Sequence, residues 1–175
     1  MTMNKVECSN CGSNAHIVHG CYEFPESGLS SVVLHGIEIV HCDDCGNDDP
    51  IIPNLSDLMR LPAVCVISKP ERLVGEEIRF LRKYLRMTGE EFSRLLDIDK
   101  THLSKLENDA DPVGDQTDRL IRVMALITGD GLRAKLDEVV ELFSKMRAAR
   151  GRGRKKAPRP MQVQVDAPNL TYQYA

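Results

Sequence analysis

The sequence predicts an α+β fold, in which a small β-rich module precedes an all-α domain of five helices and a basic tail. Two Cys-x-x-Cys pairs enclose the first module, and β-branched and aromatic residues recur between them. From residue 71 onward, apolar residues recur instead at the three- and four-residue spacing of helices. This change of periodicity predicts that strands come first and helices second.

Charge divides the chain in the same place. Residues 1–60 contain nine acidic residues and only Lys5 and Arg60 as bases, a net charge of −7. Because the whole chain carries −3, residues 61–175 carry +4. The acidic part suits a basic protein partner, unless it is simply a solvated surface, and the basic part suits nucleic acid. No segment has the length of a membrane span, and no signal peptide is evident, so we expect a cytoplasmic protein.

The two cysteine pairs carry the most specific chemistry. Cys8 and Cys11 form the first pair, Cys42 and Cys45 form the second, and a glycine follows each pair. Each pair presents two thiolates from one tight turn, and two facing turns make the tetrahedral four-sulfur site that Zn²⁺ prefers in structural sites. We therefore expect one structural Zn²⁺ per chain, with iron as the other ion that such a site accepts. Two disulfides are the alternative, which a cytosolic location disfavours.

A complete shell of four sulfurs leaves no open position for water, and no thioredoxin-like βαβ pattern surrounds either pair. We therefore expect neither a zinc hydrolase nor a thiol oxidoreductase, and no enzymatic activity. Cys21 and Cys65 stand alone in the sequence and are expected to be small buried hydrophobes. His16, His19 and His41 lie near the pairs and are expected to be surface or supporting residues rather than ligands.

The chain divides into four parts. Residues 1–47 form the metal module, with strands expected at residues 22–24 and 32–40. Four prolines interrupt residues 48–70, which we interpret as a linker with at most a short helix at residues 55–60. The helical domain covers residues 71–149, and residues 150–175 form a basic tail.

The tail is expected to be disordered, because basic residues alternate with glycine, alanine and proline from Arg150 to Pro160. Residues 161–165 alternate apolar and polar side chains like an edge strand, which is the alternative for that segment.

Capping signals divide the helical domain into five helices. Residues 68–71 open the first helix, which ends near Met87, and Thr88 with Glu91 forms a capping box for the second. Asp99 caps a third helix at residues 100–108, and a fourth follows from about Asp115 to Thr128. The fifth helix carries an apolar stripe that forms either a homodimer seam or an internal contact, composed of Leu132, Leu136, Val139 and Phe143.

The second and third helices, at residues 88–108, fit a helix-turn-helix. In that unit the second helix lies in the major groove with its N-terminal residues toward the base edges. Apolar residues that lock the two helices would be Phe92, Leu96, Ile98, Leu103 and Leu106. We expect contacts with double-stranded DNA, since lysine donates to guanine and threonine meets a thymine methyl or a phosphate. The side chains expected to make them are Lys100, Thr101, His102 and Lys105. A plain helical bundle is the alternative.

Residues 78–109 resemble the Cro/C1 (XRE) family of DNA-binding domains. The resemblance is carried by Arg82, Thr88-x-x-Glu91-Phe92-Ser93 and Leu103-Ser104-Lys105-Leu106-Glu107-Asn108. It implies base contacts from the start and middle of the third helix, at Lys100, Thr101 and Lys105. Gly89 replaces a glutamine that holds a phosphate in many members, and Asp109 replaces a glycine.

Taken with both cysteine pairs and the segment at residues 33–37, residues 6–128 resemble the MqsA-type antitoxin family, which joins a YgiT-type zinc finger to a Cro/C1 domain. The resemblance implies a zinc module that binds a toxin, often an mRNA-cleaving ribonuclease. It also implies a homodimer that represses its own operon at a palindromic operator. The fifth helix and the tail extend past the compact family pattern. The alternative is a stand-alone transcription factor whose zinc module senses metal, redox state or a ligand.

Overall fold

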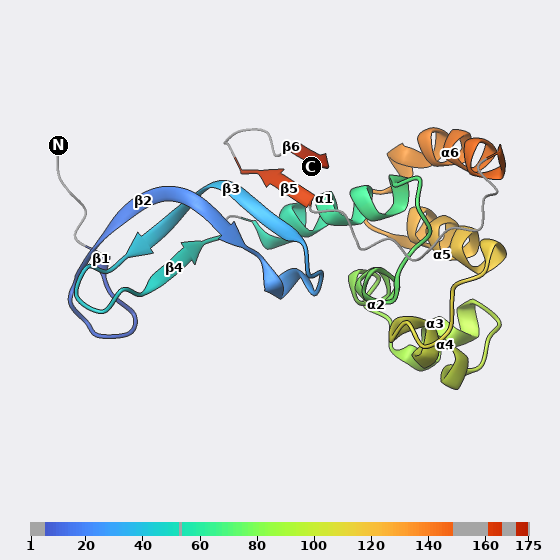
Figure 1. The fold of residues 1–175 in the computed structure, drawn as a ribbon, viewed down its shortest axis with the longest axis horizontal. Helices are drawn as coiled ribbons and strands as arrows, with labels where there is room; N and C mark the ends of the chain where they lie inside the picture. Colours follow the sequence, from blue (N-terminus) through green and yellow to red (C-terminus); the bar gives the residue numbers. More distant parts are fainter. Residues whose placement is uncertain (1–5, 53, 149–160, 166–170, 175) are drawn as a thin grey trace.

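The computed structural model describes residues 6–52, 54–148, 161–165 and 171–174. Over these residues the fold is α+β, as predicted, with an N-terminal strand region, a cluster of four cysteines and six α-helices. The strands of the metal module lie at one end of an elongated molecule and most of the helices lie at the other (Figure 1). Within these ranges, no helix is both long enough and apolar enough to cross a membrane.

A long antiparallel hairpin forms the metal module, made by β2 (Asn14–Glu23) and β3 (Val32–His41). β1 (Val6–Glu7) pairs with the start of β2, and β4 (Asp48–Ile51) pairs with the end of β3. The strand predicted at residues 32–40 is confirmed. β2 is longer than the strand predicted at residues 22–24, because its first half pairs with the second half of β3.

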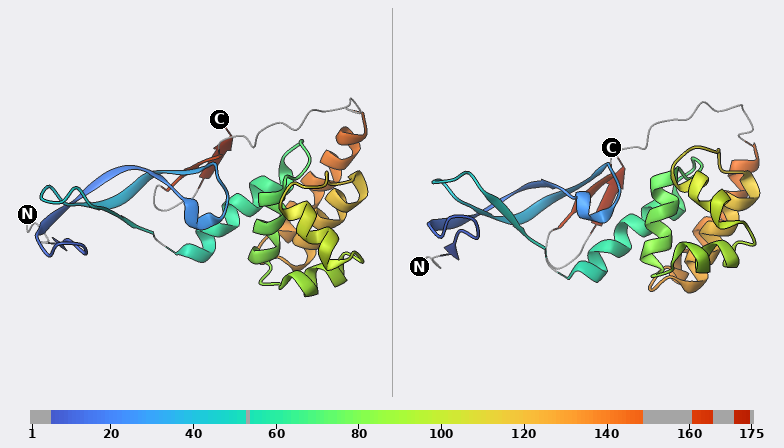
Figure 2. Two further views of the ribbon diagram at one scale, coloured as in Figure 1. Left: turned by 60° about the horizontal axis from the view of Figure 1, so that its bottom comes forward. Right: turned by 90° about the horizontal axis from the view of Figure 1, so that it is seen from below.

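The hairpin changes register between Gly20 and Cys21, and Gly36 lies across from this step at a φ of 74°. A bulge of this kind bends a strand and increases its twist. The twist of the hairpin along its length is visible in Figure 2. Cys21 is exposed beside the bulge, so its expected burial is wrong, whereas Cys65 is buried as expected.

Two C-terminal strands extend the sheet. β5 (Met161–Gln164) pairs in parallel with the start of β3, and β6 (Thr171–Tyr174) pairs antiparallel with β5. Met161 and Val163 are buried beside α1, so the expectation of a disordered tail is wrong for this segment. The alternation of apolar and polar residues was the correct signal. The basic run at residues 150–160 lies outside the described residues.

The segment interpreted as a linker, residues 48–70, contains β4 and the 14-residue helix α1 (Leu55–Ser68). α1 therefore extends beyond the helix expected at residues 55–60. Pro62 lies inside it and has no N–H to donate to the preceding turn, which usually breaks a helix. Leu58 and residues 62–67 are all buried, so tertiary packing outweighs the missing hydrogen bond.

The remaining helices follow the predicted order with small changes of boundary. They are α2 (Gly75–Tyr84), α3 (Gly89–Leu95), α4 (Lys100–Glu107), α5 (Asp115–Thr128) and α6 (Leu136–Ala148). α2 begins at Gly75 rather than at residues 68–71, because the loop before it is held in place by α5. With α1, the described residues contain one α-helix more than the five predicted.

Arg122 of α5 holds that loop. Its side chain is fully buried and donates to the carbonyl oxygens of Ile67, Lys69 and Glu71 at 3.0, 2.6 and 2.5 Å. Asp118, one turn earlier, accepts from Arg122 Nε at 3.1 Å and from the Leu73 amide at 2.7 Å. These bonds satisfy backbone groups that a helix beginning at residue 70 would otherwise use.

The apolar stripe of the fifth predicted helix packs mainly within the chain. Leu132 and Val139 are buried, and Phe143 is partly buried beneath the guanidinium of Arg119. Leu136 remains 40% exposed. The residues expected to form a dimer seam therefore contribute mostly to the core of one chain.

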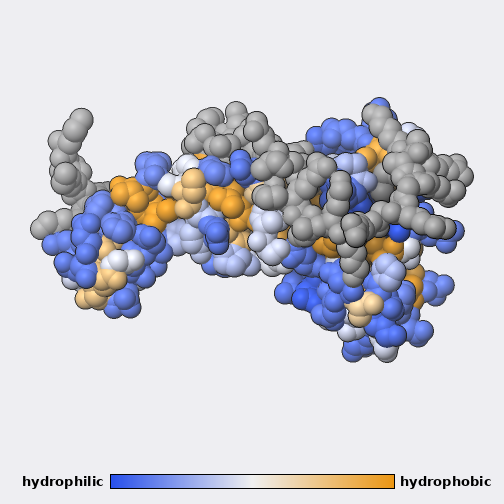
Figure 3. All heavy atoms as spheres, viewed as in Figure 1, coloured by the Kyte–Doolittle hydropathy of each residue, from blue (hydrophilic) through white to orange (hydrophobic). Residues whose placement is uncertain are grey.

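One apolar core runs from Leu34 of the sheet through α1 to the helices around Ile78 and Ile121. A second, much smaller cluster at the far end of the sheet contains Cys8, Ala15 and Cys42. On the face shown in Figure 3, hydrophobic residues gather over the strand region, and the helical end is largely hydrophilic. The far end of the sheet therefore has little apolar packing of its own.

Candidate metal centre and nucleic-acid interface

The four predicted metal ligands come together at the far end of the sheet. Cys8 and Cys11 lie in the turn between β1 and β2, and Cys42 and Cys45 lie in the turn between β3 and β4. The amide of the glycine after each pair donates back to the first cysteine's carbonyl oxygen, at 2.9 and 2.8 Å. Both glycines have φ near 70°, which side chains rarely adopt, so glycine is needed to close each turn.

The sulfur geometry fits one metal ion. The Sγ atoms of Cys8 and Cys45 are 3.6 Å apart, those of Cys11 and Cys42 are also 3.6 Å apart, and all four lie within 4.8 Å of one another. Tetrahedral zinc with Zn–S bonds of about 2.3 Å requires sulfur separations of about 3.8 Å. The two measured separations are close to this value, so the four cysteines could hold one metal ion.

The two halves of the cluster differ in their exposure. Cys8 and Cys42 are buried, whereas Cys11 and Cys45 are exposed. Hydrogen bonds with Ser13, followed by those with Cys45 and Cys42, lower the pKa of the Cys11 thiol to about 6. Backbone hydrogen bonds from Cys45 and Asp44 act to lower the pKa of Cys42, but burial and its thiol neighbours raise that pKa to about 12. Since metals bind thiolates, binding an ion here must release the protons held on the buried side.

Polar side chains, including His16 and His41, surround the four cysteines. His41 Nδ1 lies 2.6 Å from Asp48, and this hydrogen bond raises the pKa of His41. His16 Nδ1 lies 3.3 Å from Asp43. Asn10 donates to Cys45 Sγ at 3.7 Å. These contacts cross between strands and turns, so the spacing of residues in the sequence did not reveal them.

The second candidate site is built on α3 and α4, which are joined by residues 96–99. The predicted capping box opens α3: the Thr88 amide donates to Glu91 Oε2 at 2.7 Å, and the Glu91 amide donates to Thr88 Oγ1 at 3.2 Å. The Thr88 amide and the Thr88 hydroxyl both donate to the Glu91 carboxylate, and these two hydrogen bonds lower the pKa of Glu91. Phe92 of α3 packs in the core with Leu103 and Leu106 of α4, all three fully buried.

The start of α2 and the end of α4 approach closely at Gly75. A Cβ at this position would lie 2.7 Å from the carbonyl oxygens of Leu106 and Glu107, so only glycine fits. Asp109 then leaves α4 at a φ of 54°, and its carboxylate accepts from the Gly75 amide at 3.0 Å. Aspartate is one of the few side chains that tolerate this conformation. Asp109 thus makes this turn and adds a hydrogen bond between the end of α4 and the start of α2.

The structure places all four predicted DNA-contacting residues on α4 with exposed side chains: Lys100, Thr101, His102 and Lys105. The sequence did not indicate that Asp111, in the following loop, reaches two of them. Its Oδ2 lies 3.7 Å from His102 Nδ1 and 3.9 Å from Lys105 Nζ. One carboxylate therefore stands between the two groups.

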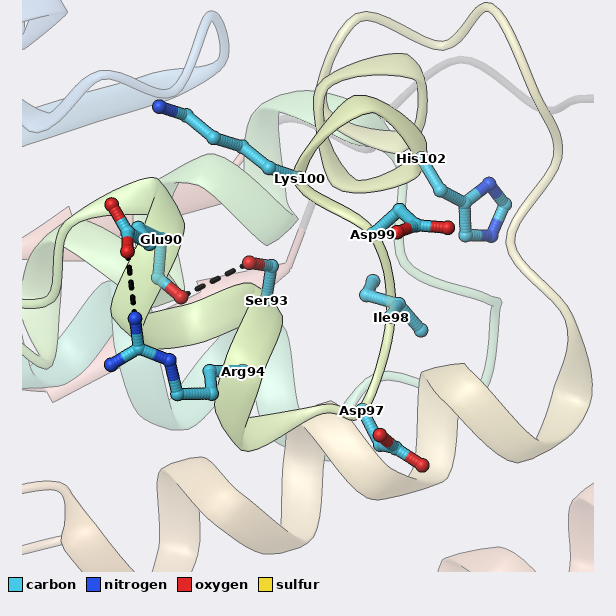
Figure 4. Close-up of a pocket in the computed structure, with 8 residues that line it drawn as sticks. All are labelled: Glu90, Ser93, Arg94, Asp97, Ile98, Asp99, Lys100 and His102. Carbon is cyan, nitrogen blue, oxygen red and sulfur yellow. Dashed lines mark hydrogen bonds and ion pairs between the residues drawn. The ribbon is translucent and has the colours of Figure 1, made fainter.

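A wide, shallow hollow of about 610 Å³ separates α3 from the start of α4 (Figure 4). Glu90 accepts from Arg94 at 2.7 Å on one side of it. Lys100 and His102 extend in different directions from the start of α4. The hollow is lined by Glu90, Ser93, Arg94, Asp97, Ile98, Asp99, Lys100 and His102.

Comparisons of this chain with models of known protein families, with curated proteins and with solved structures find no match. Any assignment of function therefore depends on the motifs and on the geometry of the two sites.

Proposed function

We propose that this protein is a sequence-specific, DNA-binding transcriptional repressor that carries one structural Zn²⁺ in its four-cysteine site. The observation that carries the proposal is the exposed face of α4, where Lys100, Thr101 and Lys105 lie on a helix fixed by both α2 and α3. An α-helix fits the major groove of B-DNA, and lysine and threonine both contact base edges there. The α3–turn–α4 unit then acts as a helix-turn-helix.

The charge around α4 bears on how this surface would bind. Asp99 is exposed directly before α4, and Asp111 lies beside Lys105. Carboxylates repel the phosphate backbone, so this surface gains little affinity that is independent of sequence. Base contacts, two copies of α4 in a homodimer and a palindromic operator would then supply the affinity. Two such helices would reach half-sites about 10 base pairs apart.

We further propose that the metal module binds a basic toxin protein, in line with the resemblance to MqsA-type antitoxins. The support for this role is the mixture of apolar and acidic residues on one face of the sheet. The pairing of strands places Ile17 beside Val40 and Val40 beside Asp49, and it places Glu38 beside Ile51. Ile17 and Ile51 are 42% and 40% exposed. Apolar side chains interspersed with carboxylates are complementary to a basic protein surface.

The metal ion would stabilise this module rather than react. Among the described residues, the small cluster of Cys8, Ala15 and Cys42, with Val40 packed against it, is what is buried around the cysteines. So small a core contributes little folding free energy, and binding of a structural ion contributes it instead.

The proposal is tested by incubating the tagged full-length protein with a library of random DNA duplexes and sequencing what it retains. We expect one enriched, two-fold symmetric sequence, together with one zinc per chain in the same sample. Retention of zinc without enrichment of any sequence would reject the DNA-binding proposal and leave the structural-zinc proposal standing. Capture from the native host should recover a small basic protein, and Ile17→Lys, which places a positive charge on the exposed face of the sheet, should lose it.

A stand-alone sensor is the second candidate, because Cys11 and Cys45 are exposed and therefore open to oxidants and chelators. In that case mild oxidation should release zinc and abolish binding to the enriched sequence, and no basic protein should be captured. An antitoxin should retain its partner in the capture experiment.

A further inference from the structure

The loop that follows α4 folds back over the helix. After Asp109 reverses the chain direction, the amides of Ala110 and Asp111 both donate to the carbonyl oxygen of Lys105, at 2.9 and 3.4 Å. These backbone bonds fix the position of Asp111 next to the last turns of α4. The fold therefore sets the position of the Asp111 backbone, from which the carboxylate can reach the last turns of α4.

That carboxylate faces two of the four residues proposed to contact DNA. His102 and Lys105 lie one helical turn apart, so their side chains leave α4 on the same side. Asp111 Oδ2 lies 3.7 Å from His102 Nδ1 and 3.9 Å from Lys105 Nζ. All three side chains are about half exposed, so their ion pairs add little to stability. Their effect is on the local charge.

We propose that Asp111 is a specificity-determining residue, which suppresses binding to DNA of arbitrary sequence by offsetting the charge of Lys105. The inference rests on the proposed DNA-binding function of α4. Sequence-independent affinity comes from cations that neutralise phosphates and release counterions. A lysine that already has a carboxylate beside it gains less from a phosphate.

The Asp111 carboxylate interferes less with a hydrogen bond from Lys105 to a base. The Lys105 ammonium has three donors, so it can donate to guanine O6 or N7 while it remains near Asp111. A base edge is neutral, and Asp111 does not repel it as it repels a phosphate. The expected result of this arrangement is lower affinity for all DNA but a larger ratio between the operator and other sequences.

Asp97 provides a matched control on the same surface. It is exposed at the end of α3, beside Ile98 in Figure 4, and its carboxylate makes no hydrogen bond or ion pair within the described part of the chain. Asp97→Asn and Asp111→Asn each remove one negative charge, but only Asp111→Asn removes it from beside a lysine and a histidine. Asparagine also tolerates the positive φ of 53° at residue 97.

The experiment measures the affinity of the zinc-loaded, full-length protein for the enriched operator and for a random-sequence duplex, over a series of salt concentrations. We expect Asp111→Asn to raise affinity for the random duplex roughly threefold to tenfold and to steepen its salt dependence by about one unit. Operator affinity should rise less, so the ratio of the two affinities should fall. Asp97→Asn should change the random-duplex affinity by no more than about twofold.

Equal gains in the two variants would overturn the inference, because removal of any carboxylate would then suffice. A loss of affinity in Asp111→Asn would also overturn it, provided that Asp111→Ser behaves the same way and both variants keep the thermal stability of the parent protein. Wild-type protein that prefers no sequence would contradict the proposed function itself. The charge effect of Asp111 can still be judged in that case from the random duplex alone. Equal affinities of Asp111→Asn and Asp97→Asn for that duplex would reject it.

Discussion

Arg82 holds Glu107 through two hydrogen bonds, 2.6 Å from Nε to Oε1 and 3.0 Å from Nη2 to Oε2. The third guanidinium nitrogen, Nη1, donates to the carbonyl oxygen of Met87 at 3.1 Å. The Arg82 and Glu107 side chains are only 16% and 10% exposed, and the hydrogen bond to Glu107 raises the pKa of Arg82 further. This pair connects α2 to the last turn of α4, so it sets the orientation of the helix proposed to read DNA.

The Arg82–Glu107 pair should contribute measurably to stability. In a double-mutant cycle with Arg82→Ala and Glu107→Ala, we expect a coupling free energy of about 1–3 kcal/mol, because charge-assisted hydrogen bonds of largely buried groups are strong. Urea unfolding at neutral pH measures it. The control is the exposed pair of Glu90 and Arg94, which should couple by about 0.5 kcal/mol or less. Similar coupling in the two pairs would contradict the assigned role.

Loss of Arg122 should be far more costly than loss of an exposed arginine. Arg122→Ala leaves the Asp118 carboxylate buried without its cation and frees three backbone carbonyl groups, so we expect a loss of about 3–5 kcal/mol in the free energy of unfolding. Arg72, which pairs with Asp115 on the surface, is the control, and Arg72→Ala should cost less than about 1 kcal/mol. A comparable effect of both substitutions would mean that Arg122 does not hold the loop between α1 and α2.

Glu77 should give stability a pH dependence of unusual sign for a carboxylate. Burial raises its pKa above the ordinary value of 4.5, although Lys69 Nζ, at 2.5 Å from Oε2, acts in the opposite direction. The folded state therefore binds the proton more tightly than the unfolded state does. The resulting stabilisation is complete below pH 4.5 and is lost as the pH rises through the raised pKa.

The matching measurement is the difference in unfolding free energy between the parent protein and Glu77→Gln, from pH 4.5 to neutral. We expect the parent to lose stability relative to this variant as the pH rises, because glutamine does not titrate. Zinc binding, which also depends on pH, cancels in the difference. Glu90→Gln removes an exposed carboxylate and is the control. A difference that rises with pH would show that Lys69, rather than burial, controls Glu77.

Removal of the metal should unfold only the far end of the sheet. Cys42→Ser or a chelator should abolish the protection of backbone amides in β1, in β4 and in the paired ends of β2 and β3, because the small buried cluster there, among the described residues, contains Cys8 and Cys42. Hydrogen exchange should remain slow in α1 and α5, which belong to the larger core. Cys21→Ser is the control and should leave both the zinc content and the exchange pattern unchanged. Full protection without metal would contradict a structural ion.

The parts of this structure that the sequence predicted are those governed by local chemistry. The glycine after each cysteine pair closes a turn within five residues, and Thr88 with Glu91 caps α3 within one turn. The helical spacing of apolar residues predicted α5. These features depend on neighbours in the sequence, so patterns of residue type were sufficient to find them.

The parts that were missed depend on contacts between distant residues. Pro62 argues against a helix locally, and only the burial of its neighbours in the common core sustains α1. The alternation at residues 161–165 indicated a strand, but no local pattern encodes the pairing of Met161 with Val32 that joins it to the sheet. Asp111 reaches Lys105 through a turn at Asp109 that the loop's composition alone did not specify.

The most direct test of the central claim uses Thr101→Ala and Lys105→Ala on the enriched operator and on a random duplex. If α4 reads base edges, each substitution should weaken operator binding by about 1–3 kcal/mol and random-duplex binding much less. Lys135→Ala on the surface before α6 removes the same charge as Lys105→Ala and should affect the two DNAs alike. Equal losses on operator and random DNA for Thr101→Ala and Lys105→Ala would contradict the assignment of α4 as the helix that reads sequence.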